Sequence, residues 1–217
     1  MKPLDPSELV EPGAPLRPLA PTLDLGFTAR AGMLAGIGDL PGPHLGAEAG
    51  IGLRIDEYEV SLTFEYAGGA TARLTSRPDA GADFERIAGI ARACRDLYPW
   101  SARPSAGAPF SLPLRADRGP FAVTVGACLG VELGEMAGQG FGVTYPERGE
   151  AFWAAPRFDV RGALNLVGPL SLSLDVGVAF PLDPRRFIIT AADQSVLVVY
   201  TPAPAAGRLG LALQLDL

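Results

Sequence analysis

The sequence predicts an all-β fold, an antiparallel up-and-down transmembrane β-barrel of eight strands. The C-terminal stretch 207–217 alternates leucine with small or polar residues, which puts the leucines on one face of a strand. Similar apolar faces recur along the chain. They exceed the roughly 5–6 residues of an average soluble strand and match the roughly 9–11 that a membrane-spanning strand needs. Charged residues are 19% of the chain, and no apolar stretch reaches the roughly 18 residues of a transmembrane helix.

The alternating pattern places the strands and the turns between them. We expect strands at residues 22–34, 45–55, 58–66, 110–115, 121–134, 152–166, 170–180 and 207–217. Short turns are expected at Asp56-Glu57, Asp117-Arg118 and Gly168-Pro169, and long connections at 68–109, 136–151 and 181–206. Short turns at one end and long loops at the other are typical of outer-membrane barrels, whose short turns are periplasmic.

The alternation fails in residues 68–109. Within this range, residues 83–98 carry apolar side chains at helical spacing behind Asp83, which can cap a helix. We therefore expect a long surface loop with a short helix, followed by the fourth strand. A poorly alternating strand is the alternative.

The chain divides into a tether and a barrel. Residues 1–21 are rich in proline, which favours an extended segment, and residues 22–217 form the barrel. Residues 1–5 are not followed by the apolar region of a signal peptide. We expect that a leader or preceding region has been removed; the alternative is a cytosolic protein, and the periodicity favours the first.

Charged residues recur on the face opposite the leucines. An eight-stranded barrel is just wide enough for side chains to fill, and an unpaired buried charge is costly, so these charges are expected to pair in the lumen. A proton or ion path is the alternative. The predicted network consists of Arg30, Glu48, Arg54, Glu65, Glu132, Arg157, Asp159, Arg161 and Asp175, and Glu59 shares the inward face.

Little in the sequence indicates catalysis or a cofactor. His44 is the single histidine; we expect it in a loop at the barrel rim and do not expect an enzyme. Cys94 and Cys128 are a candidate disulfide, with two unrelated thiols as the alternative, and no residue spacing indicates a metal site. The net charge of −6 argues against binding nucleic acid.

Three segments, 119–140, 168–187 and 206–217, resemble small eight-stranded outer-membrane β-barrels of the OmpA/OmpX kind, as they occur in myxobacteria and related deltaproteobacteria. The resemblance implies an outer-membrane location. It also implies that the last strand is read by the barrel-assembly machinery through its outward face, although that signal usually ends in an aromatic residue and here ends in leucine. That face consists of Leu209, Leu211, Leu213, Leu215 and Leu217.

Three functions fit these features. The first is a structural or interaction protein of the outer membrane, embedded in the lipid bilayer, whose loops 68–109 and 181–206 or tether bind a partner. The second is a narrow pore or a subunit of an envelope transport or motility assembly, because glycines such as Gly50 and Gly130 on the inner faces leave space. The third is a soluble barrel that holds a small apolar ligand and turns its apolar faces inward.

Overall fold

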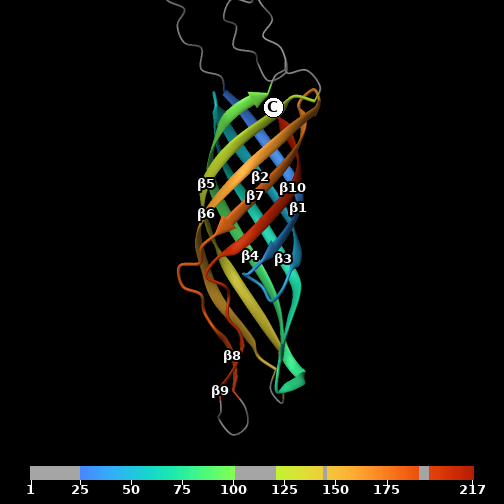
Figure 1. The fold of residues 1–217 in the computed structure, drawn as a ribbon, viewed down its shortest axis with the longest axis vertical. Helices are drawn as coiled ribbons and strands as arrows, with labels where there is room; N and C mark the ends of the chain where they lie inside the picture. The colour runs from blue at the N-terminus through green and yellow to red at the C-terminus, as the bar shows by residue number, and fades with distance from the viewer. Residues whose placement is uncertain (1–24, 101–120, 144–145, 191–195) are drawn as a thin grey trace, which may run out of the picture.

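The computed structural model describes residues 25–100, 121–143, 146–190 and 196–217. Its strands are β1 Leu25–Ile37, β2 His44–Ile55, β3 Tyr58–Leu74, β4 Arg77–Trp100, β5 Val123–Phe141, β6 Arg148–Val167, β7 Leu170–Ala179, β8 Phe187–Thr190, β9 Val196–Tyr200 and β10 Ala206–Asp216. Eight of them close an antiparallel barrel in the order β1-β10-β7-β6-β5-β4-β3-β2, and β8 and β9 form a separate hairpin (Figure 1). The predicted eight-stranded up-and-down barrel is confirmed.

The barrel wall has two heights. Strands β1, β2, β7 and β10 are 10–13 residues long, whereas β3 to β6 are 17–24 residues long. The four long strands therefore continue past the residues where β2 and β7 stop pairing with them, Gly68 and Arg157. We call these continuations, together with the β8–β9 hairpin, the projection; it occupies the lower half of Figure 1.

The predicted helix at residues 83–98 is wrong, because these residues are part of strand β4. Alternation is obscured there because the inward face carries the apolar residues Ala88, Ile90 and Cys94 beside its arginines, while Ile87 points outward. Apolar residues on both faces of a strand can imitate helical spacing. No helix in the described residues is long and apolar enough to cross a membrane.

The predicted long loop at 68–109 is also wrong, since β3 runs to Leu74 and a turn at Thr75-Ser76 leads directly into β4. Gly69, with a φ of +77°, lies in a bulge where the β3–β4 register shifts. This left-handed conformation suits glycine, and the bulge carries β3 from the barrel into the projection. The fourth strand and the Asp117-Arg118 turn were predicted within residues 101–120, which lie outside the described part; the barrel's fourth strand is β4.

The two chain ends of the barrel lie at one end of the molecule, together with the short turns at Asp56-Glu57 and Gly168-Pro169 (Figure 1). Both short turns agree with the prediction. β4 ends and β5 begins at this same end. The projection lies at the opposite end.

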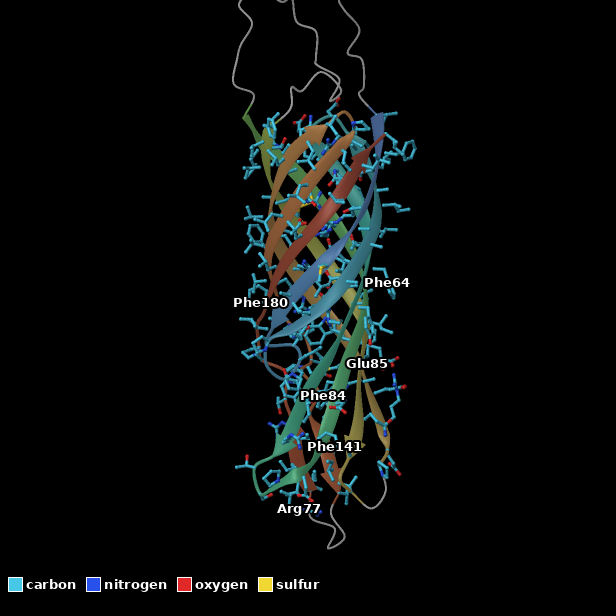
Figure 2. All side chains as sticks on the ribbon, turned by 90° about the vertical axis from the view of Figure 1, so that its right-hand side faces the viewer. Phe64, Arg77, Phe84, Glu85, Phe141 and Phe180 are labelled. Carbon is cyan, nitrogen blue, oxygen red and sulfur yellow. A yellow bond between two sulfur atoms is a disulfide. The ribbon has the colours of Figure 1, made fainter. Side chains whose placement is uncertain are left out.

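The two faces of the wall differ sharply in polarity. On β10, Leu211 and Leu213 are 50% and 52% exposed, whereas the inward-facing Arg208 and Gln214 are 4% and 2% exposed. Figure 2 shows Phe64 and Phe180 pointing away from the barrel on opposite sides. The apolar faces therefore point outward, which contradicts the alternative of an apolar ligand-binding interior.

An apolar core fills the base of the projection instead. Phe84 lies inside it (Figure 2), with its ring 4.9 Å from that of Phe187 and 5.3 Å from that of Tyr200. Met136 and Trp153 are buried in the same cluster. The β8–β9 hairpin is thus packed onto the inner side of β3 to β6.

Candidate functional site

The barrel encloses a charged network with equal numbers of both signs. Among the described residues, seven arginines and seven carboxylates are buried, so the net charge of −6 arises elsewhere. They are Arg30, Asp39, Glu48, Arg54, Glu59, Glu65, Arg86, Arg92, Glu132, Arg157, Asp159, Arg161, Asp175 and Arg208. The alternation of a strand determines which residues point inward but not the sign of their charge. The equal numbers of positive and negative groups arise from residues on all eight barrel strands together.

The part of the network nearest the chain ends links β2, β3, β6 and β7. Arg54 lies 3.3 Å from Glu59, and Arg161 lies 2.7 Å from the other oxygen of the same carboxylate. Arg161 also donates to Asp175 at 3.0 Å. One guanidinium thus joins carboxylates whose strands are not neighbours in the wall.

Asp175 connects this part to the middle of the lumen. Its second oxygen accepts a hydrogen bond from Arg30 at 2.7 Å, and Arg30 also pairs with Glu48. Arg92 approaches Asp175 at 3.5 Å and donates to Thr63 at 3.1 Å. Asp175 is therefore contacted by three arginines, Arg30, Arg92 and Arg161.

Glu65 is the centre of the part nearest the projection. It accepts hydrogen bonds from Arg86 at 2.8 Å and from Arg157 at 2.7 Å. Arg157 donates in turn to Asp159 at 2.8 Å, and Arg86 pairs with Glu132. Arg92 lies 3.9 Å from Asp159 and so links this part to the middle of the lumen, and the ion pairs continue without interruption from Arg54 to the rim.

The turn between β1 and β2 closes the network at the rim. Asp39 in this turn is fully buried, 2.8 Å from Arg208 and 3.1 Å from Arg86. Burial opposes ionisation of Asp39, but the two guanidinium groups outweigh it and hold its pKa below the usual value. Leu40 is buried beside it, so the turn folds into the barrel mouth.

His44 and Tyr200 support this turn. His44 begins β2 at the rim, as expected, but it is buried: Nε2 lies 3.4 Å from Asp39 and Nδ1 lies 3.4 Å from the Gly42 carbonyl. The Tyr200 hydroxyl donates to the Gly38 carbonyl at 3.0 Å. Burial, and the nearby Asp39, raise the pKa of Tyr200, which keeps this donor protonated.

The structure places all nine predicted network residues inside the barrel. Eight of them form ion pairs with another member of the set, whereas Arg54 joins the set through Glu59. It adds Arg86, Arg92, Arg208 and Asp39, which the prediction lacks. Arg86 and Arg92 were hidden by the helix reading of β4. Arg208 lies within the predicted strand 207–217 and continues its inward alternation, so the same pattern could have identified it, whereas no sequence pattern signals that Asp39 folds inward.

Cys94 and Cys128 lie directly opposite each other on β4 and β5. Their Cα atoms are 3.9 Å apart, and the sulfur atoms are at bonding distance inside the barrel. A disulfide here would fix the register between two strands whose connection is the 101–122 segment.

Inward glycines make room for the large charged side chains. Gly130 lies opposite both Arg92 on β4 and Arg157 on β6, and a Cβ at Gly130 would lie 2.8 Å from Arg92 Cγ. Gly50 lies opposite Arg30 in the same way. The space beside Gly130 is thus occupied by Arg92, whereas the atoms nearest to an added Cβ at Gly50 belong to Leu62 and Thr63.

An eight-stranded antiparallel barrel with an apolar exterior and an ion-paired interior has the architecture of small outer-membrane β-barrel proteins. Among the solved structures similar to this chain is Neisserial surface protein A (NspA), with a TM-score of 0.53 and 10% sequence identity, covering 88% of this chain and 96% of the other. Another is a major outer membrane protein from Thermus thermophilus, with a TM-score of 0.59 and 14% identity, covering 89% and 99%.

At these identities the likeness is one of fold. No protein family matched the sequence, and no characterised protein matched it in a sequence comparison. Within the described ranges, no group of three or more histidine, cysteine or carboxylate side chains is arranged to hold a metal ion.

Proposed function

We propose that this protein is an outer-membrane β-barrel that serves as a structural and interaction protein, holding the projection beyond the membrane surface to bind a partner. One observation carries the proposal: leucines cover the outside of the barrel while seven arginines and seven carboxylates lie inside it. This is the reverse of a water-soluble protein, and it suits a wall that faces hydrocarbon.

The lumen favours a plug rather than a pore. Its charges are paired across strands that are distant in the sequence, and the inward Gly130 lies against the Arg92 side chain. In an eight-stranded barrel such side chains fill the interior. The network therefore acts as a structural core of ion-paired side chains, and we propose no catalytic role for it. His44 lies against Asp39 and belongs to the same core.

The geometry also favours an orientation. Both barrel termini lie opposite the projection, so a periplasmic tether at residues 1–21 would leave the projection outside the cell. The partner surface we propose is the projection with the connection 181–206, in place of the predicted loop 68–109. The outward leucines of β10, from Leu209 to Leu217, would be presented to the barrel-assembly machinery. The more specific likeness to OmpA/OmpX-type barrels of myxobacteria remains part of this proposal.

Two arginine substitutions at equally exposed positions test the membrane assignment. Leu211 on the barrel wall and Val198 on β9 are both 50% exposed. An arginine on the lipid face near the midplane costs roughly 2–4 kcal/mol, whereas one in water costs little. We expect Leu211→Arg to reduce the amount of folded protein in the outer-membrane fraction, and Val198→Arg to leave it unchanged.

The readout is heat-modifiable gel migration of protein expressed with an export signal. A compact band in SDS that shifts on boiling, found in outer membranes and lost in Leu211→Arg, supports the proposal. A wild-type protein that is soluble without detergent, with both variants equally folded, would overturn it. Steady ion conductance by the wild-type barrel in planar bilayers would contradict a filled lumen and support the pore as its function.

A further inference from the structure

The wall of the projection has an open seam beside β6. After β7 the chain continues to pair with β6, because Phe180 N donates to Pro156 O and Leu182 N donates to Ala154 O, each at 2.9 Å. In this register the next residue is Pro184, opposite Phe152. Proline has no N–H to donate, so the ladder ends there.

The edge of β6 beyond this point remains available. Residues of an antiparallel strand direct their backbone groups alternately to one neighbour and the other, so Phe152 and Glu150 face the same side as Ala154. In the described residues, 148–153 are hydrogen-bonded to β5 but to no strand on this second side, since β8 and β9 form their own sheet. Unpaired strand edges are templates for another strand.

A slot of about 390 Å³ separates this edge from β8. Its lining combines apolar and charged side chains: Glu150, Phe152, Arg185, Arg186, Phe187 and Ile188. Phe152 is 70% exposed and Ile188 53% exposed, so two apolar side chains flank the open backbone. A polypeptide strand can pair with the backbone edge and also contact these apolar side chains, whereas a compact polar ligand offers no apolar surface to them.

The charges of the slot indicate the sign of the occupant. Glu150 is paired with Arg148 at 3.0 Å, and Arg185 with Asp183 at 2.6 Å. Once these pairs are set aside, Arg186 gives the slot a net positive charge among the described residues. An acidic side chain is therefore favoured at this position.

We propose that the slot between β6 and β8 accepts an extended peptide segment of a partner protein, which adds to β6 as a strand. Its apolar side chains contact Phe152 and Ile188, and an acidic side chain contacts Arg186. This inference rests on the proposed interaction function and specifies its mode of recognition.

The test uses the full chain in detergent micelles and two fluorescein-labelled hexapeptides. One has the sequence Thr-Val-Thr-Asp-Thr-Val, and the other has lysine in place of aspartate. Binding is measured by fluorescence anisotropy. We expect the acidic peptide to bind more tightly, and Arg186→Glu to reverse the preference.

A matched pair at position 150 separates the backbone from the side chain. Glu150→Pro removes the N–H on the open edge but no hydrogen bond to β5, whereas Glu150→Ala keeps that N–H. We expect the proline variant to lose roughly tenfold in affinity relative to the alanine variant, the effect of about one lost hydrogen bond. Heat-modifiable migration checks that both variants fold.

Equal binding by the two position-150 variants, or no binding of either peptide, would overturn the strand-addition proposal while leaving the membrane assignment intact. A wild-type dimer that the proline variant abolishes, measured by light scattering, would assign the slot to a second copy of this chain and overturn the heterologous partner. A wild-type protein whose gel migration does not change on boiling would instead contradict the proposed outer-membrane barrel itself.

Discussion

Glu48 on β2 lies directly opposite Glu65 on β3, with both carboxylates inside the barrel. Like charges directly across two strands are destabilising by themselves. Here each is neutralised from a different direction: Glu48 pairs with Arg30 on β1, whereas Glu65 pairs with Arg86 and Arg157 on β4 and β6. The two carboxylates thus belong to different branches of the network, and removing either branch has a separate cost.

Arg30→Met tests the first branch. The substitution keeps most of the side-chain volume but leaves Glu48 and Asp175 without this partner, and breaking a buried pair costs about 3–5 kcal/mol. We expect a loss of this size in the free energy of unfolding, measured by urea titration in lipid vesicles. The exposed Arg77→Met, which affects only a 4.0 Å pair with Asp79, is the control. Equal stability of the two variants would show that the lumen pairs add no net stability.

Gly177→Ala tests whether the inward glycines are required by packing. A Cβ at this position would collide with the Asp159 carboxylate, which accepts hydrogen bonds from Arg157. We expect a destabilised barrel with a lower temperature for the heat-modifiable shift. Gly89→Ala is the control, because its added Cβ would lie 3.9 Å from its nearest neighbour, the Leu133 carbonyl. A Gly177→Ala barrel as heat-resistant as the control would contradict the close packing.

The disulfide prediction is tested chemically. Cys94 and Cys128 are separated by 34 positions, and the chain-entropy model gives a stabilisation of about 4 kcal/mol for a loop of that length. Denatured, unreduced protein is expected to take up no thiol reagent, and reduced protein to take up two equivalents, as counted by mass spectrometry. Replacing both cysteines with serine should lower the urea midpoint. Reaction at both thiols without reduction would show that the bond is absent.

Asp39 predicts a dependence of stability on pH. Its folded-state pKa is lowered from 3.8, so the folded state favours the charged form, and the stabilisation is present above about pH 4 and lost as the pH falls through the folded value. The difference in unfolding free energy between wild type and Asp39→Asn should therefore shrink as the pH falls below 3.8. The comparison is made by urea titration at pH 7 and at acidic pH. A difference that stays constant would show that the Arg86 and Arg208 contacts do not depend on the charge of Asp39.

The strands that face lipid on one side and ions on the other were predictable, because both faces are uniform. Leu211 and Gln214 on β10 are examples: a period of two separates them without knowledge of any partner strand. β4 was not predictable in this way, since Ala88 and Ile90 make its inward face partly apolar.

The ion pairs were predictable as a set but not as individual partners. Arg157 and Glu65 are 92 residues apart, and their contact depends on how the wall closes. The inward position of Asp39 could not be predicted, because it lies in a turn, where no alternation defines an inward side. Its position depends on its ion pairs with Arg86 and Arg208.

The separation in sequence of the paired charges links neutralisation to closure. Arg30 and Asp175 are 145 residues apart and come from β1 and β7, which meet only when β10 completes the ring between them. Before that event, the hairpins already formed would expose unbalanced guanidinium and carboxylate groups, which hydrocarbon does not tolerate. A partly closed barrel is therefore unstable within the bilayer, and membrane insertion and barrel closure must proceed together.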